Sequence, residues 1–138
     1  MILVSACLLG ENCKYNGSNN NNEKVHTYLA DKEYCPFCPE CLGDMTTPRA
    51  PIEINSDGKA VNTNGEDKSE QLNNGAHKTL QLCRELAVDI VIMKDGSPSC
   101  GVHNIYDGTF THKKIPGLGI TAKKLAQNGY RIISEDDL

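Results

Sequence analysis

Two short, largely apolar runs place the strongest restriction on the fold of this 138-residue chain. Residues 2–6 and 88–93 are apolar almost throughout and too brief for a globular helix, which is typical of buried strands. Another strand is predicted over residues 130–133, and helices over residues 23–31, 67–86 and 121–127. Strands that alternate with helices indicate an α/β fold. We therefore expect a single three-layer domain over residues 1–138, with a mostly parallel sheet flanked by helices.

The helix expected over residues 67–86 has the clearest pattern. Apolar side chains recur at helical spacing along one face, which predicts that this face packs on the core. Its members are Leu72, Ala76, Leu80, Cys83 and Ala87. Asp67 and Glu70 have the spacing of an N-terminal capping box. Asn128 and Gly129 are expected to cap the C-terminus of the last helix.

The segments between these elements are expected to be loops with short hairpins. The asparagine-rich residues 16–22 predict an exposed loop without a chemical role, and two prolines in residues 34–41 favour a short edge strand or an extended loop. Hairpins are expected near residues 57–58 and 107–108. The long irregular stretch over residues 94–119 is typical of a functional loop in a domain of this size.

Composition excludes several classes of protein. The chain has 14 Lys and Arg against 18 Asp and Glu, which gives a net charge of −4. This balance argues against a protein that binds the phosphate backbone of a nucleic acid. No apolar run approaches the roughly 18 residues that span a membrane. The N-terminus lacks the basic stretch of a secretory signal. We expect a cytoplasmic protein with neither a nucleic-acid nor a membrane partner.

Seven cysteines are unusual for such a chain. They are Cys7, Cys13, Cys35, Cys38, Cys41, Cys83 and Cys100. A reducing compartment keeps such residues as thiols, so this number points to metal or redox chemistry rather than to disulfides. A single cysteine can instead be a small buried hydrophobic residue. Cys83, on the apolar helix face, is interpreted in this way.

One arrangement of the cysteines is local. Cys35, Cys38 and Cys41 repeat the first three positions of the bacterial ferredoxin motif, but Met45 stands at the fourth. A zinc site formed by Cys35, Cys38 and a second pair from elsewhere is the alternative. His103, three residues after Cys100, is a further candidate ligand for it.

The other arrangement is dispersed. Cys7 follows the first strand, Cys38 lies at or after a candidate strand, and Cys100 lies in the loop after residues 88–93. Ligands bind at the carboxyl ends of parallel strands, so these three thiols are expected to converge there. Three thiolates can hold a cubane iron–sulfur cluster and leave one iron open as a Lewis acid.

Polar residues beside these cysteines are candidates for catalysis. Glu40 lies two residues after Cys38, where a carboxylate can transfer protons, although a solvated loop charge would look the same. Ser97 and Ser99 place hydroxyls beside Cys100, as a plain Ser-Pro turn also would. Alternatively, Cys100 itself is a nucleophile or carries a persulfide, with His103 as the base.

Several motifs together resemble a bacterial family catalogued as a domain of unknown function, whose members include the thiouracil desulfidases. The motifs are VSACLLG (4–10), CPE (38–40), PRAPIE (48–53), KDGSPSCG (94–101), IYDGTF (105–110) and GLGIT (117–121). The resemblance extends over nearly the whole chain. The combination of the first, second and fourth motifs is specific, whereas any one alone is weak.

The resemblance implies a [4Fe-4S] cluster held by Cys7, Cys38 and Cys100. It implies that the thiocarbonyl sulfur of a small thiolated compound, such as a thiopyrimidine, binds the open iron. A water activated by an acidic residue would then replace sulfur by oxygen without redox chemistry. Glu40 is the candidate for that residue, and Ser99 or Ser97 would orient substrate or water.

The chain departs from the family pattern at two places. Residues 14–17 read Lys-Tyr-Asn-Gly where the family has Arg-Tyr-Asp-Gly, and Cys41 and Asp44 follow the CPE motif in place of an apolar residue and a glycine. The extra thiols leave a second function open: a non-catalytic binding protein stabilised by zinc or by a cluster. A structural zinc site would have four ligands and no open position.

Overall fold

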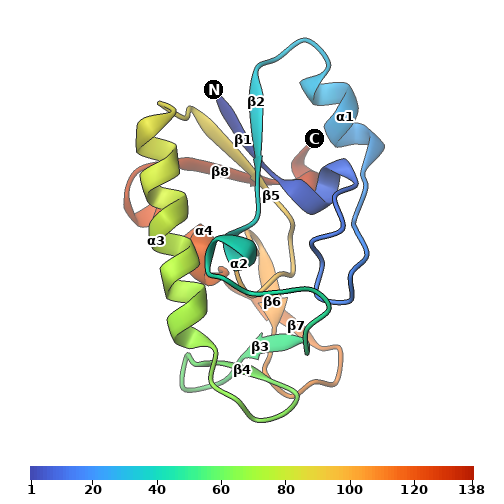
Figure 1. Cartoon of the computed structure of the whole chain (residues 1–138), viewed down its shortest axis with the longest axis vertical. Coiled ribbons are helices and arrows are strands. Elements are labelled where there is room, and N and C mark those ends of the chain that lie inside the picture. The colour runs from blue at the N-terminus through green and yellow to red at the C-terminus, as the bar shows by residue number, and fades with distance from the viewer.

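Four parallel strands form the central sheet, in the order β2-β1-β5-β8 (Figure 1). The computed structural model describes all of residues 1–138. The strands are β1 (Ile2–Ser5), β2 (Tyr34–Phe37), β5 (Ile90–Met93) and β8 (Arg131–Ser134). β1 and β5 lie in the middle and are buried along their whole length, which explains their apolar sequences. The predicted α/β class with a mostly parallel sheet is confirmed.

Helices cover both faces of the sheet. α3 (Ser69–Glu85) and α4 (Ile120–Gln127) pack on one face, and η1 (Ala6–Leu9) with α1 (Glu23–Leu29) packs on the other. Successive side chains of a strand point to opposite faces, so Leu3 joins the core beneath α3 and Val4 the core beneath α1. Cys83 is fully buried in the core beneath α3, as its place on the apolar helix face predicts.

Two helix ends test the predicted caps. The expected capping box at the start of α3 is wrong, because the helix begins at Ser69 and Lys68 occupies the cap position without a side-chain hydrogen bond. Asp67 instead accepts a hydrogen bond from the Ser69 amide at 2.9 Å. The end of α4 follows the prediction: Gly129 has a φ of 83°, which glycine adopts readily. None of the helices is long and apolar enough to cross a membrane.

Short elements gather beyond the carboxyl ends of the strands. They are α2 (Pro39–Leu42), the hairpin of β3 (Ile52–Ile54) and β4 (Ala60–Asn62), the hairpin of β6 (Asn104–Tyr106) and β7 (Lys114–Pro116), and η2 (Glu135–Asp137). Both hairpins lie at the lower end of the molecule in Figure 1. The sequence predicts the two hairpins but not the helix α2. Pro39 at its first position is a residue that favours helix starts.

Two glycines let α2 lie directly against α3. A Cβ atom on Gly75, in the middle of α3, would lie 2.0 Å from the Pro39 carbonyl oxygen. A Cβ atom on Gly43 would lie 2.2 Å from the Gln71 carbonyl oxygen. The close approach explains why α3 carries a glycine in its interior, where that residue weakens a helix. The contact also sets the position of Glu40, which lies within α2.

We expect the substitution Gly75→Ala to destabilise the protein by about 1–3 kcal/mol, because the new methyl group meets backbone that cannot move aside cheaply. Helix propensity alone would predict the opposite, a gain of about 1 kcal/mol. Urea unfolding measures the difference. Asn74→Ala is the matched control, since Asn74 is the exposed neighbour on the same helix. Equal or greater stability of Gly75→Ala would contradict the contact.

Candidate active site and metal centre

A cavity of about 580 Å³ opens at the carboxyl edge of the sheet, between the strands and the two hairpins. Four cysteine side chains line it: Cys7, Cys13, Cys38 and Cys100. Cys7 and Cys38 come shortly after the adjacent strands β1 and β2, and Cys100 comes from the loop after β5. The structure thus brings together the dispersed trio expected from the sequence and adds a fourth thiol.

Cys13 links two of the other thiols. Its thiol interacts with those of both Cys7 and Cys38, and each shifts the pKa of the other. Cys100 is only 5% exposed, and its sulfur accepts a hydrogen bond from Ser5 Oγ at 3.6 Å. A set of soft sulfur donors from separate segments therefore faces one cavity.

These contacts shift the acidity of the thiols in opposite directions. The hydrogen bond from Cys13 is the main cause that lowers the pKa of Cys7 and lowers that of Cys38 to about 6, in both cases against burial. The pKa of Cys13 is raised because its interactions with the Cys38 and Cys7 thiols favour the form of Cys13 that keeps its proton. Burial raises the pKa of Cys100. Cys7 and Cys38 are thus the thiols that most easily become thiolates, the form that binds metals.

The asparagine-rich loop over residues 16–22, which the sequence predicts to be exposed and without a chemical role, reaches this site. The Asn20 side chain lines the cavity and helps to lower the pKa of Cys7. Its backbone amide donates to the Cys7 carbonyl at 2.9 Å, and Asn22 donates to Leu8 at 2.9 Å. The loop folds back over η1 through these bonds, which no local sequence pattern indicates.

The local cysteine trio does not come together. Cys38 and Cys41 are in contact, but Cys35 packs beside the core beneath α3 and its thiol donates only to the Pro36 carbonyl, at 3.5 Å. His103, considered as a zinc ligand or as a base for Cys100, is 54% exposed and bonds Asp137 at 2.8 Å. It does not line the cavity. No three or more His, Cys, Asp or Glu side chains are grouped closely enough for a single metal ion.

Glu40 points into the cavity and is held on both carboxylate oxygens. Oε2 forms an ion pair with Arg49, and Oε1 accepts a hydrogen bond from Ser99 Oγ at 3.2 Å. Arg49 also donates to the carbonyls of Thr46 and Cys13, at 3.0 and 3.1 Å. The side chains of Glu40 and Arg49 are 15% and 9% exposed. The structure thus brings together Glu40 and Ser99, two of the candidate site residues, and adds Arg49, which the sequence analysis did not single out.

Ser97 has a structural task in the loop that carries Cys100. Its Oγ accepts hydrogen bonds from the amides of Ser99 and Cys100, at 3.1 and 3.0 Å. The hydroxyl faces the same cavity. Its proton is not used in these two bonds.

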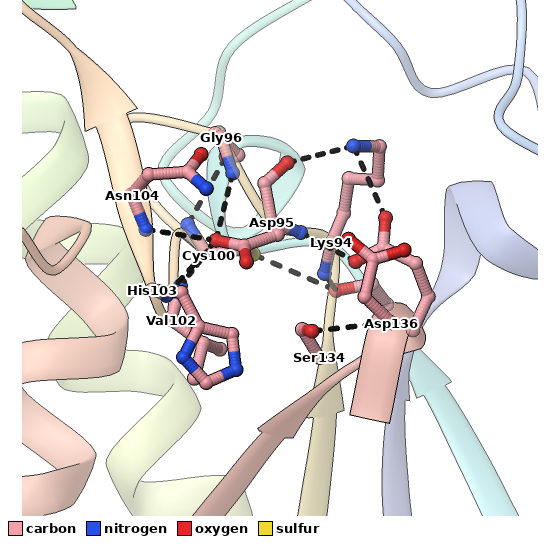
Figure 2. A network of polar contacts seen from close by, with 12 residues as sticks. Lys94, Asp95, Gly96, Cys100, Val102, His103, Asn104, Ser134 and Asp136 are labelled. Atoms are coloured by element: carbon pink, nitrogen blue, oxygen red, sulfur yellow. Dashed lines mark hydrogen bonds and ion pairs between the residues drawn. The ribbon is translucent and has the colours of Figure 1, made fainter. Parts of the chain in front are cut away.

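Asp95 organises the rest of this loop, as Figure 2 shows. Its Oδ1 accepts hydrogen bonds from the amides of Gly96, Val102, His103 and Asn104, at 2.9 to 3.2 Å. Burial would raise the pKa of Asp95, but the backbone hydrogen bonds outweigh it and lower the pKa below its usual value. The charged carboxylate therefore holds the turn on which Cys100 sits.

A cationic side chain joins this network to the thiols. Lys94 Nζ lies 3.1 Å from Glu135 Oε2 and donates to the Asp95 carbonyl at 2.7 Å (Figure 2). Glu135 Oε1 in turn accepts from the Asp95 amide at 2.7 Å. Lys94 lines the cavity, and its charge helps to lower the pKa of Cys7.

We expect Asp95→Ala to destabilise the protein by about 2–4 kcal/mol, because four backbone amides lose their charged acceptor. The pKa of Asp95 is lowered on folding, so its contribution is complete above the unfolded pKa of roughly 3.9 and is lost as the pH falls through the folded pKa. Unfolding at pH 7 and at low pH should thus show a difference that shrinks in acid. Asp57→Ala, at an exposed position, is the control. An equally small loss of stability in both variants would contradict the role of Asp95 as the acceptor that holds the loop.

Aromatic and basic residues form the remaining wall of the cavity. Tyr15, Tyr106 and Phe110 line it. The ammonium groups of Lys14 and Lys114 lie 5.8 and 5.5 Å from the ring centres of Tyr15 and Tyr106. Flat aromatic faces beside cations suit a planar, polar ring as ligand.

A family model and a solved structure point to the same family of known proteins. The chain matches the 2-thiouracil desulfurase family over residues 2–137. It is 47% identical over 147 residues to the uncharacterized protein YbbK of Bacillus subtilis (strain 168), covering 100% of this chain and 97% of that protein. Among solved structures, a [4Fe-4S]-dependent thiouracil desulfidase, TudS, is 35% identical with a TM-score of 0.92, covering 99% of this chain and 91% of that one. The resemblance drawn from the motifs is thereby confirmed.

Proposed function

This chain belongs to the 2-thiouracil desulfurase family, and from that premise we propose that it is an iron–sulfur-dependent desulfidase. Its substrate would be a small thiolated compound such as a thiopyrimidine, and its reaction a hydrolytic, non-redox replacement of sulfur by oxygen. The observation that carries this proposal is the convergence of three thiols and the Glu40–Ser99 pair on one cavity. The similar TudS structure is of a [4Fe-4S]-dependent enzyme.

The donor set fits an iron–sulfur cluster. Cys7, Cys38 and Cys100 would hold it, since all three sulfurs face the cavity and soft thiolates are the donors that such clusters use. With three protein ligands, a [4Fe-4S] cluster would supply Lewis-acid chemistry toward a thiocarbonyl sulfur at its open iron. Lys94 and the hydrogen bonds to Cys7 favour the thiolate form before any cluster is bound.

The remaining residues would prepare the carbon–sulfur bond for hydrolysis. Glu40 would accept a proton from the attacking water, and Ser99 and Arg49 would keep its carboxylate oriented. Ser99 would also orient the water or the substrate, and Ser97 would donate its hydroxyl proton to a polar atom of the ring. Tyr15 and Phe110 would bind the ring on its flat faces.

Anaerobic purification tests this proposal, with iron, zinc and acid-labile sulfide measured on the same sample. We expect about four irons and four sulfides per chain, a broad absorption band near ~400 nm, and sulfide release from 2-thiouracil. Stoichiometric zinc without labile sulfide, even after reconstitution, would refute the desulfidase and favour the non-catalytic zinc-stabilised protein.

A further inference from the structure

Cys41 is an exposed thiol that none of the proposed steps uses, and it shares the first turn of α2 with Cys38. Cys38 is the N-cap residue of this helix and Cys41 its third helical residue, the position that an N-cap side chain faces, and each thiol shifts the pKa of the other. Cys38 precedes α2 in an extended conformation, with φ −138° and ψ 109°, and Cys41 lies within the helix. The pair reads Cys-Pro-Glu-Cys, the Cys-x-x-Cys spacing that accommodates a reversible disulfide in redox proteins.

We propose that Cys38 and Cys41 form a reversible disulfide in the cluster-free protein, so that loading of the cluster depends on the thiol redox state. The disulfide itself follows from the placement of the two cysteines at the cap and in the first turn of one short helix. Its consequence for loading rests on the proposed function, in which Cys38 is a ligand. Oxidation removes that ligand, and reduction returns it.

The oxidant would be a soluble disulfide such as glutathione disulfide, which accepts the two electrons that the cysteines lose. One protein thiolate attacks a sulfur of glutathione disulfide, which forms a mixed disulfide and releases one glutathione thiolate. The second protein thiolate attacks the protein sulfur of that mixed disulfide, forming the Cys38–Cys41 bond and releasing the second glutathione. The two protein thiols lose two protons and two electrons, and glutathione disulfide takes up all of them to become two glutathione thiols.

Cys13 is the competing partner for Cys38, because it also contacts that sulfur. Two features favour Cys41. Cys41 is exposed, whereas Cys13 is half-buried, so a soluble disulfide reaches Cys41 more easily. Cys41 interacts with Cys38, whereas Cys13 is shared between Cys7 and Cys38.

Peptide mapping of the oxidised, cluster-free full-length chain tests the pairing. The chain is treated with glutathione disulfide, alkylated and cleaved after glutamate, which separates Cys38 from Cys41 at Glu40. We expect residues 34–40 to be linked to residues 41–53, and the link to persist in Cys35→Ser and to vanish in Cys41→Ser. A link from Cys38 to Cys13 instead, or a free Cys38, would overturn the proposal.

Loading is then measured with ferrous iron and sulfide, without a thiol reductant. We expect the oxidised wild type to bind several-fold less iron than the reduced protein, and dithiothreitol to restore binding. Oxidised Cys41→Ser should bind as much iron as its reduced form, and Cys35→Ser should behave as wild type. Equal loading of oxidised and reduced wild type would refute the redox control. If the reduced protein binds no cluster at all, the proposed function fails, while the mapped disulfide is judged separately.

Discussion

Replacement of Glu40 by Gln is expected to lower the rate of sulfide release by about 10²- to 10⁴-fold, the typical contribution of a group that transfers a proton. The amide has nearly the same shape and can still accept the hydrogen bond from Ser99 Oγ. It cannot accept a proton from water at neutral pH. Iron and labile sulfide should stay near wild-type values, because no ligand is removed.

The control for this variant addresses the ion pair that it breaks. Arg49 loses its charged partner, so the thermal midpoint is measured alongside activity to separate a loss of folding from a loss of chemistry. Glu11→Gln makes the same chemical change at an exposed residue outside the cavity and should retain full activity. Wild-type rates in Glu40→Gln, with the cluster in place, would remove Glu40 from the mechanism.

Serine in place of Cys7, Cys38 or Cys100 is expected to abolish stable cluster binding and reduce sulfide release to background. A hydroxyl is a hard donor that stays protonated at neutral pH, so it cannot replace a soft thiolate on iron. The measurement is iron and acid-labile sulfide per chain after anaerobic reconstitution, followed by the activity assay. Each variant removes one of only three proposed ligands, so partial retention is not expected.

Two further cysteine variants make this test specific. Cys35→Ser should retain cluster and activity, because Cys35 packs beside the core away from the cavity. Cys13→Ser should also retain iron, since Cys13 is not one of the proposed ligands and the hydroxyl keeps a hydrogen-bond donor at the same place. Loss of iron in Cys13→Ser, with retention in Cys100→Ser, would show that a different set of thiols holds the cluster.

The sequence by itself determined the elements whose patterns are local. The apolar runs that became β1 and β5, the apolar face of α3 with Cys83, and both hairpins follow from side-chain periodicity and turn residues. The convergence of Cys7, Cys38 and Cys100 on one cavity was also predictable, because carboxyl ends of parallel strands meet at one edge.

Only the tertiary structure decided which neighbours these residues have. The alternation of side chains along β2 places Cys35 beside the core beneath α3. Cys35 and Cys38 are therefore separated, although they are three residues apart in the sequence. The return of the loop over η1 brings Asn20 and Cys13 to the Cys7 sulfur, and Arg49 reaches Glu40 from nine residues away. Such contacts depend on where loops are tied down by backbone hydrogen bonds, and no periodicity in the sequence records that.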